Sequence, residues 1–134
     1  MKYYATQLTA PELSILEEAT TAALEQLGRS HVSDPHGYAD AAISEDLMDA
    51  LLDLVYEAAD AAGPDEQCTV LVLTEDLREV ARALLTAASA AFGERSAEAQ
   101  DEGRIAEAAL LLAQSAFARQ VELRLTLAAI EREE

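Results

Sequence analysis

Between Gln67 and Gly93 the chain reads QCTVLVLTEDLREVARALLTAASAAFG, and within this segment an extended run changes abruptly into a helix. The run Thr69–Leu73 is apolar on both faces, as is typical of a strand that other elements cover. Thr74 follows as a helix cap, and the next two residues place carboxylates at the positive end of the helix dipole. The segment therefore predicts a strand over 68–73 and a helix over 75–92.

A similar segment begins near the N-terminus, where Lys2–Gly28 reads KYYATQLTAPELSILEEATTAALEQLG. Its Thr9-Ala10-Pro11-Glu12 run has the form of a capping box, in which a hydroxyl and a carboxylate satisfy free amide donors. Proline is tolerated in such a first turn. This segment predicts a strand over 2–8 and a helix over 10–27.

The two segments align at an offset of 73 − 8 = 65 residues, which pairs Leu8 with Leu73 and Gly28 with Gly93. We interpret the chain as a single domain, 1–134, with a candidate internal repeat of 2–66 and 67–132. Alanine-rich helices also align by chance, so the repeat and the chance match both remain open.

Helical spacing of apolar residues extends over most of the remaining chain. A loop over 28–40 is followed by a helix over 41–62. The segment 96–103 is a loop or a short helical turn, and a last helix runs from about Arg104 to Arg132. The predicted fold is mainly α, with four principal helices in two strand-helix-helix halves. The sequence leaves open whether the short strands pair as a minimal two-stranded sheet.

The composition limits the classes of function. The chain has 134 residues, of which 51% are apolar, and 26 acidic against 9 basic residues give a net charge of −17. That charge repels nucleic acid and anionic membranes, so we expect no direct nucleic-acid or membrane binding. With one cysteine, Cys68, no leader-like N-terminus and no apolar run of about 18 residues, the chain is expected to be soluble and cytoplasmic.

The least random feature is the distribution of charge along the chain. No Lys or Arg occurs between Arg29 and Arg78, whereas that interval holds 12 Asp and Glu. On the predicted helix over 41–62, acidic residues recur every three or four positions and so share one face, opposite an apolar arc. The candidate partner-binding residues on that face are Glu45, Asp46, Asp49, Asp53, Glu57 and Asp60.

Two interpretations of this acidic face compete. It either keeps an apolar-rich protein in solution or docks on a basic protein surface. Its charges are spaced about 4 Å apart, close to the ~3.4 Å between phosphates of one DNA strand. A mimic of duplex DNA would need a second acidic row, from a second protomer or from the first half's other acids: Glu12, Glu17, Glu18 and Glu25.

Catalytic and metal chemistry are not indicated. The loop residues His31, Asp34, His36 and Asp40 include ligand types that suit Zn²⁺ or Mn²⁺, but Asp-Pro-His-Gly is also ordinary turn sequence. There is no phosphate-binding glycine loop, nucleophile elbow or Cys-x-x-Cys. We predict no enzyme activity, no metal and no cofactor.

The leading hypothesis is a non-catalytic acidic interaction protein. It would bind and mask a basic surface of a nucleic-acid-binding type of protein, such as a nuclease, as an inhibitor, anti-restriction or immunity protein does. The alternative is a homodimeric assembly module whose contact is the helix 104–132, with the acidic face conferring only solubility. Neither the partner nor the oligomeric state follows from the sequence.

Overall fold

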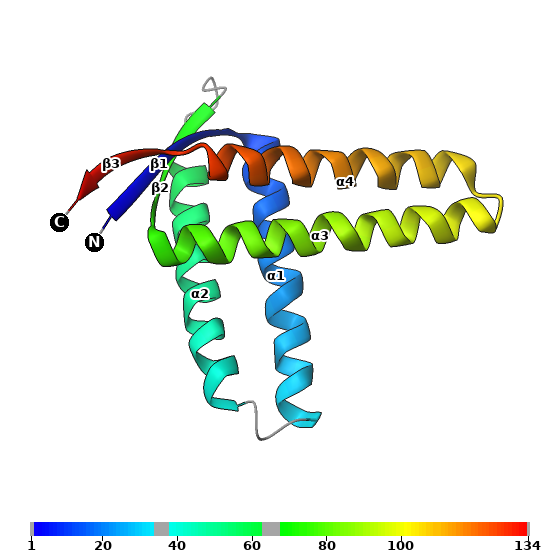
Figure 1. The fold of residues 1–134 in the computed structure, drawn as a ribbon, viewed down its shortest axis with the longest axis horizontal. Helices are drawn as coiled ribbons and strands as arrows, with labels where there is room; N and C mark the ends of the chain where they lie inside the picture. The colour runs from blue at the N-terminus through cyan, green and yellow to red at the C-terminus, as the bar shows by residue number, and fades with distance from the viewer. Residues whose placement is uncertain (1, 34–37, 63–67, 134) are drawn as a thin grey trace.

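The computed structural model describes residues 2–33, 38–62 and 68–133, and side chains over 2–26, 45–62 and 68–130. The elements follow one another as β1 (Lys2–Thr9), α1 (Ala10–Ser33), α2 (Tyr38–Ala61), β2 (Cys68–Thr74), α3 (Glu75–Asp101), α4 (Ile105–Thr126) and β3 (Ala129–Glu133). The predicted mainly α fold, with a strand followed by two helices in each half, is therefore confirmed. Figure 1 shows that α1 and α2 run side by side, while α3 and α4 form a second, transverse hairpin.

The short strands form one antiparallel sheet in the order β2-β1-β3. The two predicted strands pair from Tyr3 to Thr9 of β1, with Leu8 opposite Thr69 and Tyr4 opposite Leu73. Alternate residues, including Leu8, Leu71 and Leu73, point towards the helices and are buried. The sheet thus closes one end of the helical core, near the point where the two hairpins cross (Figure 1).

Local capping chemistry starts both helices that follow a strand. The backbone amide of Thr9 donates to Glu12 Oε1 at 2.9 Å, and the amide of Glu12 donates to Thr9 Oγ1 at 3.3 Å. This reciprocal pair confirms the predicted capping box at the start of α1. At the start of α3, Thr74 Oγ1 accepts from the amide of Leu77 at 3.3 Å, as the sequence also predicted.

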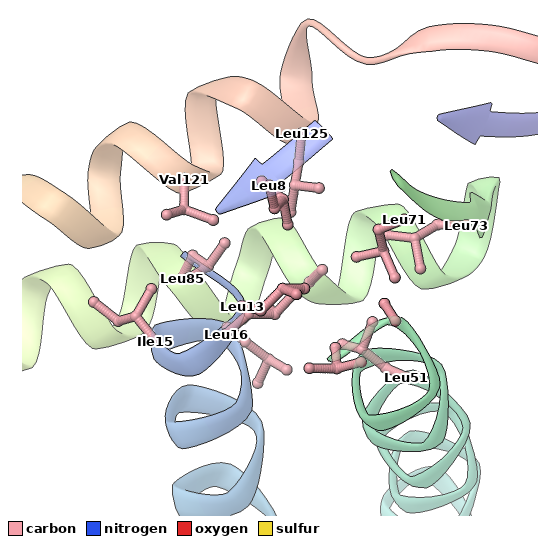
Figure 2. Packing of buried hydrophobic residues seen from close by; sticks show 14 of the residues in the cluster. Leu8, Leu13, Ile15, Leu16, Leu51, Leu71, Leu73, Leu85, Val121 and Leu125 are labelled. Atoms are coloured by element: carbon pink, nitrogen blue, oxygen red, sulfur yellow. The ribbon is translucent and has the colours of Figure 1, made fainter. Parts of the chain in front are cut away.

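Leucine and valine side chains from all four helices meet in one core beneath the sheet. Figure 2 shows Leu16 of α1 and Leu51 of α2 converging on Leu71 and Leu73, while Leu125 of α4 lies against Leu8. Each of these side chains is at most 2% exposed. Burial of an aliphatic side chain contributes about 1.5–3 kcal/mol, so this cluster is the main source of stability.

Beyond this core, α3 and α4 continue alone as a hairpin (Figure 1). Small side chains line their contact: Ser89 Oγ donates to the carbonyl oxygen of Ser115 at 2.9 Å, and Ser115 Oγ donates to that of Ser89 at 2.7 Å. Nearer the tip, Ser96 Oγ donates to the carbonyl oxygen of Ala108 at 2.6 Å. These bonds satisfy buried hydroxyls where the helices approach too closely for large residues.

Two predicted helix stops are wrong, because Gly28 and Gly93 lie inside α1 and α3. The described residues of the predicted loop over 28–40 are helical, and α3 continues to Asp101, through most of the segment predicted as a loop or a short helical turn. A glycine costs a helix only about 1 kcal/mol, and in α3 the contacts with α4 outweigh that cost. The chain turns instead at Gly103, whose φ of +78° is readily adopted only by glycine.

The last predicted helix also ends earlier than expected. Residues beyond Thr126 leave the helix, and Ala129–Glu133 pair with β1 as a third strand. Ile130 fits a helical period, but the free edge of β1 offers backbone hydrogen bonds that outweigh it. The sheet therefore has three strands instead of the two that the sequence suggested.

Candidate functional site: the acidic face of α2

The candidate site is the outer face of α2, which the core fixes in orientation. The inner arc of the helix carries Leu51, Val55 and Ala58, all buried, the first two fully. These residues pack against α1, α3 and β2. Because the inner arc is anchored on three elements, the opposite arc must face outward.

The predicted carboxylates lie on that outward arc. Five of the six are exposed, and the sixth, Glu45, is half-buried at the edge of the row. From Asp46 to Asp60 the row covers 14 helical steps, or about 21 Å. We call the five exposed residues the acidic face of α2: Asp46, Asp49, Asp53, Glu57 and Asp60.

Four arginines of the described residues pair with carboxylates outside the acidic face of α2. Arg82 contacts Glu79 and Glu122, and Arg104 contacts Glu102 and Glu107. These carboxylates hold the pKa of both guanidinium groups above its usual value. Within the described residues, no ion pair joins any carboxylate of the acidic face of α2 to a basic side chain.

The neighbouring helix α1 does not supply a complete second acidic row. Glu12 is only 1% exposed and its Oε2 lies 2.7 Å from Arg124 Nε, so this carboxylate is neutralised inside the fold. The suggestion that Glu12 contributes to a duplex-like charge pattern is therefore wrong. Glu18 and Glu25 are exposed on α1, and Glu17 is half-buried.

An exposed tyrosine beside the acidic face went unnoticed in the sequence. Tyr56 of α2 is 45% exposed and its hydroxyl is held by the Glu17 carboxylate of α1. The negative charge of Glu17 raises the pKa of Tyr56 above its usual value. Helical spacing places Tyr56 next to Asp53 and Asp60, and tyrosine is enriched at protein interfaces.

The structure brings no metal-binding group together among the side chains that it describes. Of the candidate loop residues, Asp34 and His36 lie outside the described residues, and the side chains of His31 and Asp40 do as well. The backbones of His31 and Asp40 belong to α1 and α2 respectively.

One hollow of the surface is lined by residues of α1, α3 and α4 and by none of the acidic face of α2. It has a volume of about 410 Å³ and lies between α1 and α3, where alanine side chains leave the helices incompletely filled. Ala19, Ala22 and Ala88 form its wall, and Glu18 and Arg95 are its charged residues. A wall of methyl groups offers few polar atoms with which to orient a substrate.

Comparisons with protein-family models, with curated proteins and with solved structures each return no match for this chain. In the described part of the chain, no helix combines the length and apolar character that a membrane span requires. The geometry of the surface is therefore the basis for assigning a function.

Proposed function

We propose that this protein is a non-catalytic interaction protein whose acidic face of α2 docks on a basic surface of another protein. The observation that supports the proposal is a row of five exposed carboxylates without an ion pair to any described basic side chain. Opposite charges across an interface give specificity and rapid association.

The free energy of the folded state gives a physical reason to look for a partner. Acidic residues three or four positions apart on a helix repel one another by a few tenths of a kcal/mol per pair. The row on α2 therefore costs roughly 1–2 kcal/mol. A basic surface would turn this repulsion into attraction at each carboxylate.

The spacing of the charges indicates the kind of basic surface. Neighbouring carboxylates of the row lie on average about 5 Å apart along the helix axis, a charge spacing of the same order as the ~3.4 Å of one nucleic-acid strand. A groove lined by Lys and Arg that tracks a single strand would meet such a row along its length. The proposed role is to occupy such a groove, as an inhibitor or immunity protein does, with Tyr56 as an aromatic contact at the edge.

The test is affinity capture from cell lysate at low salt, with the double variant Asp49→Lys/Asp53→Lys compared with the wild type. We expect the wild type to retain basic proteins that a salt gradient elutes, and the variant to lose them, because reversal places two cations in the row. The captured protein is identified by mass spectrometry and titrated directly.

A charge-matched control separates the site from net charge. Glu94→Lys/Glu98→Lys changes the charge of the chain by the same amount, at exposed positions on α3. This control should retain the captured proteins, and circular dichroism should show unchanged helix content in both variants. Equal loss of binding in the two variants, or no loss in either, would contradict the proposal.

A further inference from the structure

Helix α4 is covered on only one side. Ala118, Val121 and Leu125 are fully buried, and Figure 2 shows Val121 and Leu125 directed towards Leu85 and Leu8. The described contacts of α4 are made with α3, α1 and β1. Its opposite side is nonetheless as apolar as the covered side.

The uncovered side carries a narrow row of apolar residues, which Gln120 interrupts at one position. Ile105, Leu112, Leu123 and Leu127 are 62%, 61%, 54% and 75% exposed, and the exposed residues Ala109 and Ala116 lie between them. At 100° per residue all six fall within about 60° of the helix circumference. We call this set the apolar stripe of α4. Such a narrow row resembles the seam of a coiled coil.

We infer that the apolar stripe of α4 is the contact between two copies of this chain, which pair as an antiparallel homodimer. The inference concerns a different surface from the acidic face of α2 and does not depend on the proposed function. The sequence suggested only that the last helix forms a dimer contact. The inference specifies which face of that helix is buried and how the two copies are oriented.

The distribution of charge favours a second copy of this chain as the partner of the apolar stripe of α4. Between Ile105 and Thr126 the chain has two Glu and two Arg, so α4 is neutral, whereas α2 has seven acids and no base. Two molecules with a net charge of −17 repel each other over most of their surfaces. The neutral helix is where two copies can approach with the least repulsion.

The spacing of the stripe favours the antiparallel orientation. Gln120 lies on the same line of the helix. With it, positions 105, 109, 112, 116, 120, 123 and 127 are separated by 4, 3, 4, 4, 3 and 4 residues, and this series is the same in both directions. A two-fold axis at Ala116 then places Ala109 opposite the second copy's Leu123, and Ile105 opposite its Leu127. Leu112 then faces Gln120 of the second copy. Ala109 faces a large residue and Ala116 faces itself, which allows close approach near the axis.

The position of the acidic helices favours the same orientation. The C-terminal half of α4 lies against the body that contains α1 and α2, while its N-terminal half belongs to the projecting hairpin (Figure 1). Antiparallel pairing therefore puts the two bodies at opposite ends of a helix about 33 Å long. That separation exceeds the Debye length of roughly 8 Å, whereas parallel pairing would set the acidic bodies side by side.

The available area is consistent with a reversible dimer. The four large side chains of the stripe are 54–75% exposed, so pairing would remove apolar surface from water on both copies, where a standard interface buries ~800 Å² per partner.

The first test is sedimentation equilibrium of the full chain at tens of micromolar. We expect the wild type to be a dimer and Leu112→Asp a monomer with unchanged helix content. The matched control is Leu110→Asp, since Leu110 is equally exposed at 62% but lies about 160° from Leu112 around the helix. It should remain a dimer. A monomeric wild type, or a monomeric Leu110→Asp, overturns the inference.

The second test determines the orientation by disulfide formation in a Cys68→Ser background. Ala116→Cys should form a covalent dimer under mild oxidation, because the two sulfurs meet at the two-fold axis. Ala109→Cys alone should not, since antiparallel pairing separates the two positions by about 21 Å, but it should cross-link when mixed with Leu123→Cys. Efficient cross-linking of Ala109→Cys with itself would show parallel pairing and overturn the antiparallel assignment.

Discussion

Glu12 connects three elements through one side chain. Glu12 lies in the first turn of α1, and its Oε1 accepts a hydrogen bond from the amide of Thr9 at the end of β1. Its Oε2 lies 2.7 Å from Arg124 Nε on α4. The distance identifies an ion pair, although Oε2 has no hydrogen bond of good geometry. The attraction to Arg124 is therefore mainly electrostatic, and it compensates a charge that is almost completely buried.

We expect Arg124→Ala to lower the free energy of unfolding by about 1–2 kcal/mol. Losing the partner of a fully buried charge costs about 3–5 kcal/mol, but the Arg124 side chain is 47% exposed and water screens part of the attraction. Urea denaturation at equal protein concentration measures the effect. Arg124→Lys, which keeps the charge, should lower the free energy of unfolding by less than Arg124→Ala does. Equal stability of all three proteins would show that the pair is energetically silent.

The sequence predicted hydrogen bonds between residues a few positions apart, but not contacts between residues far apart in the chain. The capping box at Thr9 and the cap at Thr74 follow from residues within three positions, and both are confirmed. The pairing of Glu12 with Arg124 joins residues from opposite ends of the chain, so no local pattern could predict it. For the same reason the sequence grouped Glu12 with the exposed acids.

At the scale of elements, periodicity predicted the faces of helices better than their ends. The acidic and apolar arcs of α2 are where helical spacing placed them. The predicted end of α3 before Gly93 was wrong, because a glycine inside the helix is tolerated where α4 packs against it. Strand β3 was missed because its pairing depends on the free edge of β1, which is remote in sequence.

Helix α3 offers a direct test of the cost of that internal glycine. A Cβ atom at Gly93 would have its nearest neighbour at 3.8 Å, the Oγ of Ser115, which is an ordinary contact distance. We expect Gly93→Ala to stabilise the protein by about 0.5–1 kcal/mol, since alanine loses less backbone entropy in a helix. Thermal unfolding measures the change, and a lower midpoint than the wild type would show that the hairpin is too tightly packed for a methyl group.

At the scale of the whole molecule, charge and apolar surface are segregated onto different hairpins. The hairpin of α1 and α2 presents the acidic face, whereas the hairpin of α3 and α4 presents the neutral apolar stripe (Figure 1). The two surfaces can therefore be altered independently. In the inferred antiparallel dimer, the acidic faces of α2 belong to bodies at opposite ends, so each would meet its own partner.

The most direct test of the proposed function is the salt dependence of binding to the protein isolated by affinity capture. Titrations of the wild type between about 50 and 500 mM NaCl should show affinity falling steeply, because salt screens the carboxylates of α2. For Asp49→Lys/Asp53→Lys, we expect affinity to be much lower at the lowest salt and to depend only weakly on salt. The same steep dependence and affinity in the variant as in the wild type would contradict a docking role for this face.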